Sequence, residues 1–183
     1  MIRFQPNRRG FLLSSAAVMA AMGLRSAFAA GTVAIEAFDD AGKALGKKTL
    51  AKVVKTDAEW RAQLGTGLAF TVTRKADTEQ PFTGPNWDNH SAGLYRCICC
   101  DNALYSGATK FESGTGWPSF WQPIAKENVT ETHDDSFGMV RTAVACALCD
   151  AHLGHVFDDG PEPTGLRYCM NGVAMRFIPQ PTT

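Results

Sequence analysis

Cys97-Ile98-Cys99-Cys100 and Cys146-Ala147-Leu148-Cys149 are the two stretches of the 183-residue chain that decide its fold. Each contains a Cys-x-x-Cys pair, and 45 residues separate the first pair from the second. A Cys-x-x-Cys turn directs two thiolates at one point, and two such turns complete the tetrahedral sulfur shell that zinc prefers. The gap exceeds that of a compact zinc ribbon, so we expect each pair to lie on its own hairpin. The sequence therefore predicts one structural Zn²⁺ ion bound by Cys97, Cys100, Cys146 and Cys149.

Other uses of these cysteines stay open at this point. A chain with six cysteines can form a disulfide framework if it is exported, and each Cys-x-x-Cys pair can act as a redox dithiol. Cys149-x-x-His152 offers a competing shell of three cysteines and one histidine. The two matched spacings and the adjacent Cys99 and Cys100 favour the four-cysteine zinc site, with Cys99 left over beside it.

Residues 1–29 show the order of regions expected of an export signal. Asn7-Arg8-Arg9-Gly10-Phe11-Leu12 is a twin-arginine pair, a weakly apolar stretch runs to Leu24, and Ala27-Phe28-Ala29 is a small-x-small cleavage site. The stretch is too short and too rich in Ala, Ser and Gly to span a bilayer. The alternative is an amphipathic or buried N-terminal helix. The segment resembles a bacterial twin-arginine signal, so we expect cleavage after Ala29, a periplasmic protein and no stable membrane association.

Charge is unevenly distributed along the chain. Four arginines and no acidic residue precede residue 30, and the remainder has 14 basic and 18 acidic residues. A mildly acidic body lacks the basic footprint of a general nucleic-acid-binding protein. We therefore expect no nucleic-acid partner.

The pattern after the signal predicts one mainly β domain at 56–183, preceded by a β-rich lead-in segment at 30–55. Thr32 to Glu36 alternates with period 2, as a half-buried strand does. Thr56-Asp57-Ala58-Glu59 has the form of a capping box and predicts a short helix over Asp57–Leu64, ending at Gly65. The apolar, Thr-rich run from Leu68 to Arg74 predicts a strand. Val140–Ala147 and Ala174–Ile178 are the clearest other strands.

Cys169 lies far from both pairs and is the candidate nucleophile. In an extended segment, alternation places Arg167, Cys169 and Asn171 on one face, where a guanidinium favours the thiolate. His152-Leu153-Gly154-His155 follows directly after a cysteine pair and supplies candidate acid–base groups. In Ser113-Gly114-Thr115-Gly116-Trp117-Pro118-Ser119-Phe120-Trp121, glycines permit close backbone approach and the tryptophans can wall an apolar pocket or pack in the core.

These segments resemble the signature blocks of B-type methionine sulfoxide reductases, in the family's order. The blocks are Lys110 to Trp121, Ala151 to Phe157 and Gly165 to Asn171, and Thr78 to Gly84 resembles a further one. The resemblance covers roughly Asp57 to Pro179. It implies coiled antiparallel β-sheets and reduction of the R epimer of methionine sulfoxide, free or in oxidised proteins. It assigns catalysis to Cys169, His152, His155, Arg167 and Asn171, and the substrate wall to Trp117. We expect Phe120 and Phe157 to be further substrate contacts.

The resemblance also implies how the reaction proceeds. Cys169 becomes a sulfenic acid, and many family members reduce it with a cysteine at the position where this chain has Thr115. We therefore expect regeneration by an external reductant, either thioredoxin-like or a small thiol, with Cys99 as the alternative. Two rival functions remain: a zinc-stapled β binding module without catalysis, and a thiol–disulfide oxidoreductase using Cys97-x-x-Cys100.

Overall fold

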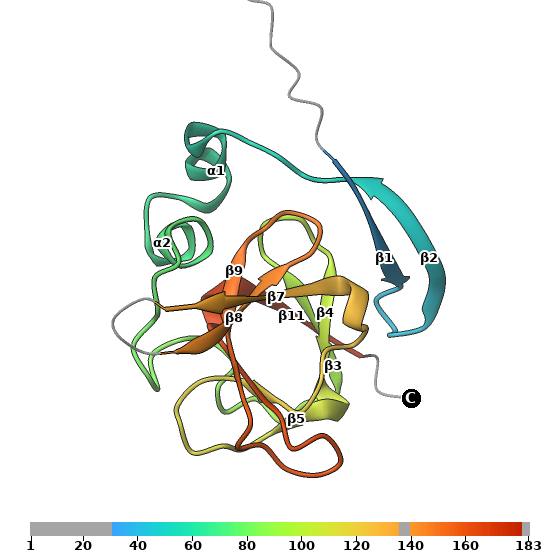
Figure 1. The fold of residues 1–183 in the computed structure, drawn as a ribbon, viewed down its shortest axis with the longest axis vertical. Coiled ribbons are helices and arrows are strands. Elements are labelled where there is room, and N and C mark those ends of the chain that lie inside the picture. The colour runs from blue at the N-terminus through green and yellow to red at the C-terminus, as the bar shows by residue number, and fades with distance from the viewer. Residues whose placement is uncertain (1–30, 136–139, 181–183) are drawn as a thin grey trace, which may run out of the picture.

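The computed structural model describes residues 31–135 and 140–180, and it is built mainly from antiparallel β-sheets, as expected (Figure 1). The largest sheet has the strand order β5-β6-β10-β9-β8-β7. Its strands are β5 (Lys110–Phe111), β6 (Ser119–Phe120), β7 (Val129–Asp134), β8 (Arg141–Cys146), β9 (His152–Phe157) and β10 (Arg167–Met170). A second sheet has the order β11-β3-β4, with β3 (Gly93–Cys97), β4 (Ala103–Ser106) and β11 (Met175–Pro179).

Aromatic side chains join these two sheets. Tyr105 on β4 stacks on Phe120 of β6 with ring centroids 4.4 Å apart, and Tyr95 on β3 meets the same ring edge-on at 4.9 Å. All three rings are fully buried. Large aromatic rings in such arrangements contribute both apolar area and specific ring–ring attraction. The core therefore lies between the two sheets and fixes how they face each other.

The predicted first helix is confirmed as α1 (Asp57–Leu64), with Gly65 following it at φ 75°. The Thr56 hydroxyl accepts a hydrogen bond from the Glu59 backbone, and the Glu59 carboxylate accepts one from the Thr56 backbone. This is the reciprocal bonding of a capping box, so two free N–H groups at the helix start are satisfied.

The prediction of a strand from Leu68 to Arg74 is wrong, because this segment forms the helix α2 (Leu68–Lys75). Phe70, Val72 and Thr73 are buried against the body of the molecule. The Thr73 hydroxyl donates to the Ala69 carbonyl one turn earlier, at 2.7 Å, so it is satisfied within the helix. β-branched residues favour strands only weakly, and burial of one helical face overrides that preference here. The helical region at the N-terminal side of the main domain thus contains two helices.

The lead-in segment forms a hairpin of β1 (Thr32–Phe38) and β2 (Ala44–Ala51), which lies along the outside of the molecule (Figure 1). The buried Asn128 side chain joins β1 to the body, because it accepts from the Glu36 backbone N–H and donates to the Glu36 carbonyl, both at 2.8 Å. Arg96 donates to the Phe38 carbonyl at 2.9 Å. The predicted strand at 32–36 is therefore confirmed as part of an attached hairpin.

The strands predicted at Val140–Ala147 and Ala174–Ile178 are confirmed with slightly different ends, as β8 and β11. Within the described ranges 31–135 and 140–180, neither helix is long and apolar enough to cross a bilayer. The predicted signal at residues 1–29 lies outside these ranges.

Candidate active site and metal site

Cys169 lies on β10, near the middle of the six-stranded sheet. It is paired with Ser119 of β6 on one side and with His155 of β9 on the other. Along β10, Tyr168 and Met170 point into the core, while Arg167 and Cys169 are half-buried on the opposite face. The alternation expected from the sequence therefore holds within the strand. Asn171 follows β10 directly.

A cavity of about 130 Å³ opens beside the Cys169 thiol. Its lining combines apolar rings with polar groups: Thr78, Trp117, Arg141, Gly154, His155, Phe157, Cys169 and Asn171. Gly154 is required at the cavity floor, since a Cβ at this position would lie 2.1 Å from the Cys169 carbonyl oxygen. A cavity with a few convergent polar groups and mostly apolar walls is the usual form of a small-molecule site.

Trp117 is held in this cavity by a residue that sequence reasoning did not single out. Its indole N–H donates to the Glu79 carbonyl at 3.1 Å, while the Glu79 backbone N–H donates to the Asn171 side chain at 2.9 Å. The Glu79 carboxylate is buried and accepts from the backbone N–H groups of Gly172 and Val173. Burial raises the pKa of this carboxyl. Glu79 thus holds both the Trp117 indole and the Asn171 side chain in position. In the sequence, Glu79 belongs to the Thr78–Gly84 block, but the block alone did not indicate what this residue does.

The two predicted histidines have different surroundings. His155 lines the cavity with Cys169, and its Nε2 lies 2.7 Å from the Asp134 carboxylate on β7. His152 is 9% exposed, and its Nε2 has no hydrogen-bond partner within the described part of the chain. Burial, with a smaller contribution from His155, lowers the pKa of His152 to about 4. His152 lines an adjoining cavity of about 640 Å³ and not the one beside Cys169.

Arg167 makes two hydrogen bonds of 2.8 Å to the Asp159 carboxylate and lies over the Phe157 ring at 4.5 Å. It does not line the 130 Å³ cavity, but it is close enough to act on the Cys169 thiol. Burial raises the pKa of the Cys169 thiol, while Thr115, Arg167 and Ser119 oppose this rise. The expectation that Arg167 favours the thiolate is therefore met in direction, but burial outweighs it in the resting protein.

The prediction that Phe120 contacts the substrate does not agree with the structure. It is fully buried between Tyr95 and Tyr105 and does not line the cavity. Adjacent strand residues face opposite sides, so β6 turns Ser119 toward Cys169 and Phe120 toward the core. Phe157 does line the cavity.

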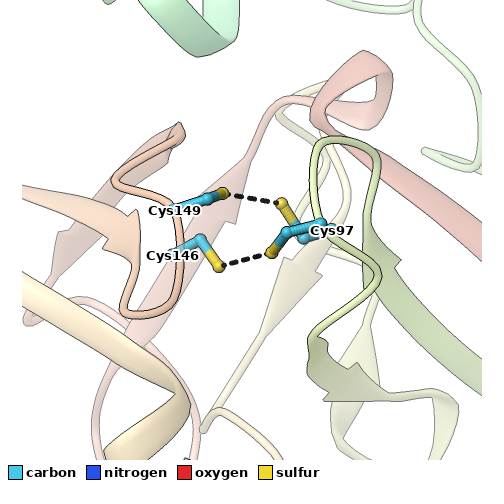
Figure 2. Close-up of side chains that lie close together, drawn as sticks. Cys97, Cys146 and Cys149 are labelled. Atoms are coloured by element: carbon cyan, nitrogen blue, oxygen red, sulfur yellow. Dashed lines mark hydrogen bonds between the residues drawn. The ribbon is translucent and has the colours of Figure 1, made fainter. Parts of the chain in front are cut away.

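The two cysteine pairs converge from two hairpins, as the spacing predicts. Cys97 and Cys100 lie at the β3–β4 turn, Cys146 and Cys149 at the β8–β9 turn, and Figure 2 shows three of these thiols pointing toward one another. The sulfurs of Cys97 and Cys149 are 3.6 Å apart, as are those of Cys100 and Cys146, and all four lie within 4.8 Å. Tetrahedral zinc with Zn–S bonds of about 2.3 Å needs sulfurs about 3.8 Å apart, so the residues fit this ion.

The same geometry bears on the disulfide framework and on the shell of three cysteines and one histidine. All six cysteines are free thiols, since the paired sulfurs are well beyond the length of a disulfide bond. His152 is not part of the four-cysteine cluster. Cys99 is buried, and its thiol interacts with Cys97 and Cys149, so it belongs to the metal side.

Comparison with known proteins agrees with this geometry. The SelR domain model matches residues 66–179. A peptide methionine sulfoxide reductase MsrB from Herminiimonas arsenicoxydans is 54% identical over 130 residues, which cover 71% of this chain and 94% of the relative. The proteins of the same name from Hahella chejuensis and Agrobacterium fabrum are 56% and 53% identical, covering 69% and 72% of this chain and 90% and 96% of the relatives.

Proposed function

The chain belongs to the SelR-domain family as an oxidoreductase of the peptide methionine sulfoxide reductase (MsrB) type, and we propose from this premise that it reduces the R epimer of methionine sulfoxide, free or in oxidised proteins. The observation that carries the proposal is the placing of the Cys169 thiol, the Trp117 indole and the His155 imidazole in one cavity. The alternative of a binding module without catalysis is not favoured, because it gives no role to this combination.

The cavity has an apolar side for the methyl group of a methyl sulfoxide and a polar side for its oxygen. The S-methyl group packs against Trp117 and Phe157, where apolar contact and the ring face favour a sulfur that becomes transiently positive. The sulfoxide oxygen lies toward His155 and Asn171, which carry hydrogen-bonding groups. Only one epimer can place its methyl group on the rings and its oxygen on the polar side at once, so this arrangement supports selectivity for one configuration.

In the proposed reaction the Cys169 thiolate attacks the sulfoxide sulfur, while an acid protonates the departing oxygen. The attack forms a bond between the Cys169 sulfur and the substrate sulfur. The protonated oxygen then moves to the Cys169 sulfur as a hydroxyl group while the sulfur–sulfur bond breaks, so the substrate sulfur gains two electrons and leaves as methionine, and Cys169 becomes a sulfenic acid. We assign the acid role to His155, since it lines the cavity and is held by Asp134, whereas burial keeps His152 neutral. A positioned acid typically contributes about 10²–10⁴-fold to the rate.

Regeneration requires two equivalents of an external thiol, either small or from a thioredoxin-like protein. The first thiol displaces water from the Cys169 sulfenic acid to form a mixed disulfide, and the second releases a disulfide and free Cys169. Cys99 is a poor internal substitute because it is buried beside the metal cysteines. Mass spectrometry after a single turnover without reductant tests this, since a Cys99–Cys169 disulfide contradicts it.

The decisive test is turnover of separated R and S epimers of methionine sulfoxide with dithiothreitol as the electron donor. We expect turnover of the R epimer alone. Cys169→Ser is expected to abolish turnover while leaving the metal content unchanged, because this residue lies outside the four-cysteine cluster. Turnover of both epimers at similar rates, or full activity of Cys169→Ser, would refute the proposal.

We further propose that the four-cysteine cluster binds one zinc ion in a structural role. Its thiolates would hold the ion, which supplies a cross-link between two hairpins rather than a reacting group. Four cysteine ligands also suit iron–sulfur clusters. Elemental analysis of the purified protein distinguishes them, with about one zinc per chain and no iron expected.

We also propose that the protein is exported folded to the periplasm by the twin-arginine route. The supporting features are Arg8-Arg9, the weakly apolar stretch and the Ala27-Phe28-Ala29 site. Loading the metal before export protects the paired thiols from wrong disulfides in an oxidising compartment. Cell fractionation tests this: replacing both arginines with lysine should retain the full-length chain in the cytoplasm.

A further inference from the structure

A chain of three hydroxyl groups begins at the Cys169 sulfur, outside the set of residues that line the substrate cavity. The Thr115 Oγ1 lies 3.8 Å from the Cys169 Sγ and 2.8 Å from the Ser113 Oγ. The Ser113 Oγ in turn lies 2.7 Å from the Ser119 Oγ. Ser119 is fully buried, and its hydroxyl donates to the Trp117 carbonyl at 3.2 Å.

The hydrogen bonds that link these three hydroxyl groups can run in either of two directions, as a count of the hydrogens shows. Each hydroxyl donates once and accepts twice. With a neutral thiol, four hydrogens serve four contacts, because the Cys169 S–H donates to Thr115 and every link points toward the Trp117 carbonyl. When Cys169 loses its proton to solvent, three hydrogens remain. The hydroxyls can then turn so that every link points toward the sulfur, and the contact with the Trp117 carbonyl is released.

The charged groups near Cys169 also bind other partners, although Arg167 acts on the thiol as well and lowers its pKa. The Arg167 guanidinium on the same strand is paired with Asp159, and His155 on β9 is bonded to Asp134 of β7. Arg141 on β8, which also lines the cavity, lies 3.0 Å from the same Asp134 carboxylate. Thr115 therefore provides the hydroxyl donor nearest to the sulfur, and Ser119 comes from the other neighbouring strand, β6.

We propose that Thr115 is a further catalytic residue that donates a hydrogen bond to the Cys169 thiolate, and that Ser113 and Ser119 are positioning residues that turn its hydroxyl toward the sulfur. The proposal deepens the function proposed above and rests on it for the reaction. It is supported by the electrostatics of the site, where Thr115 and Ser119 both lower the pKa of Cys169 against the effect of burial. Linked hydroxyls also polarise one another, so the last donor is stronger than an isolated one.

The test is the pH dependence of Cys169 alkylation by iodoacetamide in the metal-loaded protein, followed peptide by peptide with mass spectrometry. Thr115→Val keeps the shape of the side chain and removes the hydroxyl, whereas Thr115→Ser keeps the hydroxyl. We expect Thr115→Val to raise the pKa of Cys169 by about one unit, which is a tenfold loss of thiolate at neutral pH. Thr115→Ser should stay within about threefold of the unchanged protein, with Ser113→Ala between the two.

Sulfoxide turnover gives the second readout. In Thr115→Val, kcat/KM should fall by the same factor at neutral pH and recover above the new pKa of the thiol. An unchanged alkylation profile in Thr115→Val overturns the proposal, as does an equal shift in Thr115→Ser, which would indicate packing. Alkylation needs no sulfoxide, so shifted profiles in a protein without turnover would leave this inference standing and refute the proposed function.

Discussion

At the scale of single residues, we expect the side chain at position 115 to determine how Cys169 is reduced again after the proposed reaction. Its hydroxyl oxygen lies 3.8 Å from the Cys169 sulfur. A thiol at this position would be within reach of a disulfide, which needs only a small adjustment to bring two sulfurs to about 2.05 Å.

We therefore expect Thr115→Cys to change the product of a single turnover. Without reductant, the unchanged protein should carry a sulfenic acid on Cys169 that a dione probe labels. The variant should instead form a disulfide between the introduced thiol and Cys169 and lose the label. Peptide mapping under non-reducing conditions measures both. A labelled sulfenic acid in the variant, with no disulfide, would show that the two groups do not meet.

His152 makes a separate prediction about stability. Its folded-state pKa is lowered to about 4 from 6.5, mainly by burial. Between pH 6.5 and 4 the unfolded chain therefore binds a proton here that the folded protein does not, so stability falls as the pH falls through this window. The shift corresponds to about 3 kcal/mol.

We expect His152→Gln to remove this part of the acid sensitivity. Urea unfolding at pH 7 and pH 4.5 measures it: the loss of unfolding free energy between the two should be smaller in the variant than in the unchanged protein. His90→Gln is the matched control, since it removes an exposed histidine, and the loss in this variant should exceed that in His152→Gln. Equal losses in all three proteins would contradict the assignment of a neutral, buried His152.

At the scale of elements, local sequence patterns predicted most helices and strands correctly, whereas contacts between distant parts of the chain could not be predicted. The capping box predicted both ends of α1 correctly, and the alternation along β10 correctly predicted that Arg167 and Cys169 lie on one face. The α2 segment was misread because its threonines and valine suggest a strand, while the burial that makes it a helix comes from distant parts of the chain. Phe120 was misassigned although strand alternation already separates it from Ser119.

The same division holds for the site. Trp117, His155, Phe157, Cys169 and Asn171 stand in recognisable segments, and the fold brings all five to one cavity. Glu79 and Asp134 were missed because their roles lie in contacts with residues far along the chain: 92 positions separate Glu79 from Asn171, and 21 separate Asp134 from His155. No periodicity in one sequence reports such a contact.

The N-terminal hairpin makes a prediction at this scale, because the chain after it touches the turn that carries Cys149. The Val53 backbone N–H donates to the Leu148 carbonyl at 2.8 Å, and Lys52 pairs with Asp150 at 2.5 Å. These contacts hold the turn closed over the metal cysteines. We therefore expect the segment after the hairpin to slow the escape of a metal bound there.

We expect Lys52→Ala to release the metal to a chromogenic chelator about two- to threefold faster, a modest effect typical of one exposed ion pair. Lys47→Ala is the matched control. Lys47, on β2, pairs with Glu127 at the same distance of 2.5 Å but away from the metal turn. Equal release rates in the two variants would show that the hairpin does not protect the site.

At the scale of the whole molecule, the four-cysteine cluster joins the two sheets that form the core. β3 and β4 belong to the three-stranded sheet, and β8 and β9 belong to the sheet that carries Cys169. A metal bound only by the folded chain adds its binding free energy to the stability of the fold. The Cys169 sulfur thus lies outside the four-cysteine cluster but is connected to it through the six-stranded sheet.

The adjacent cysteines at the β3–β4 turn allow this link to be tested with two variants that differ by one position. Cys100→Ala removes a ligand, so we expect loss of the metal and a fall in Tm of more than about 10 °C, because a few kcal/mol correspond to such a shift in a domain of this size. Cys99→Ala removes a thiol outside the cluster and should keep about one metal per chain. Elemental analysis and calorimetry measure both quantities.

Equal metal loss in the two variants would mean that Cys99 is itself a ligand, and full metal content in Cys100→Ala would mean that three cysteines suffice. Retained sulfoxide turnover in metal-free Cys100→Ala, below its lowered Tm, would show that the metal acts on stability alone and that the sheets hold Cys169 in place without it.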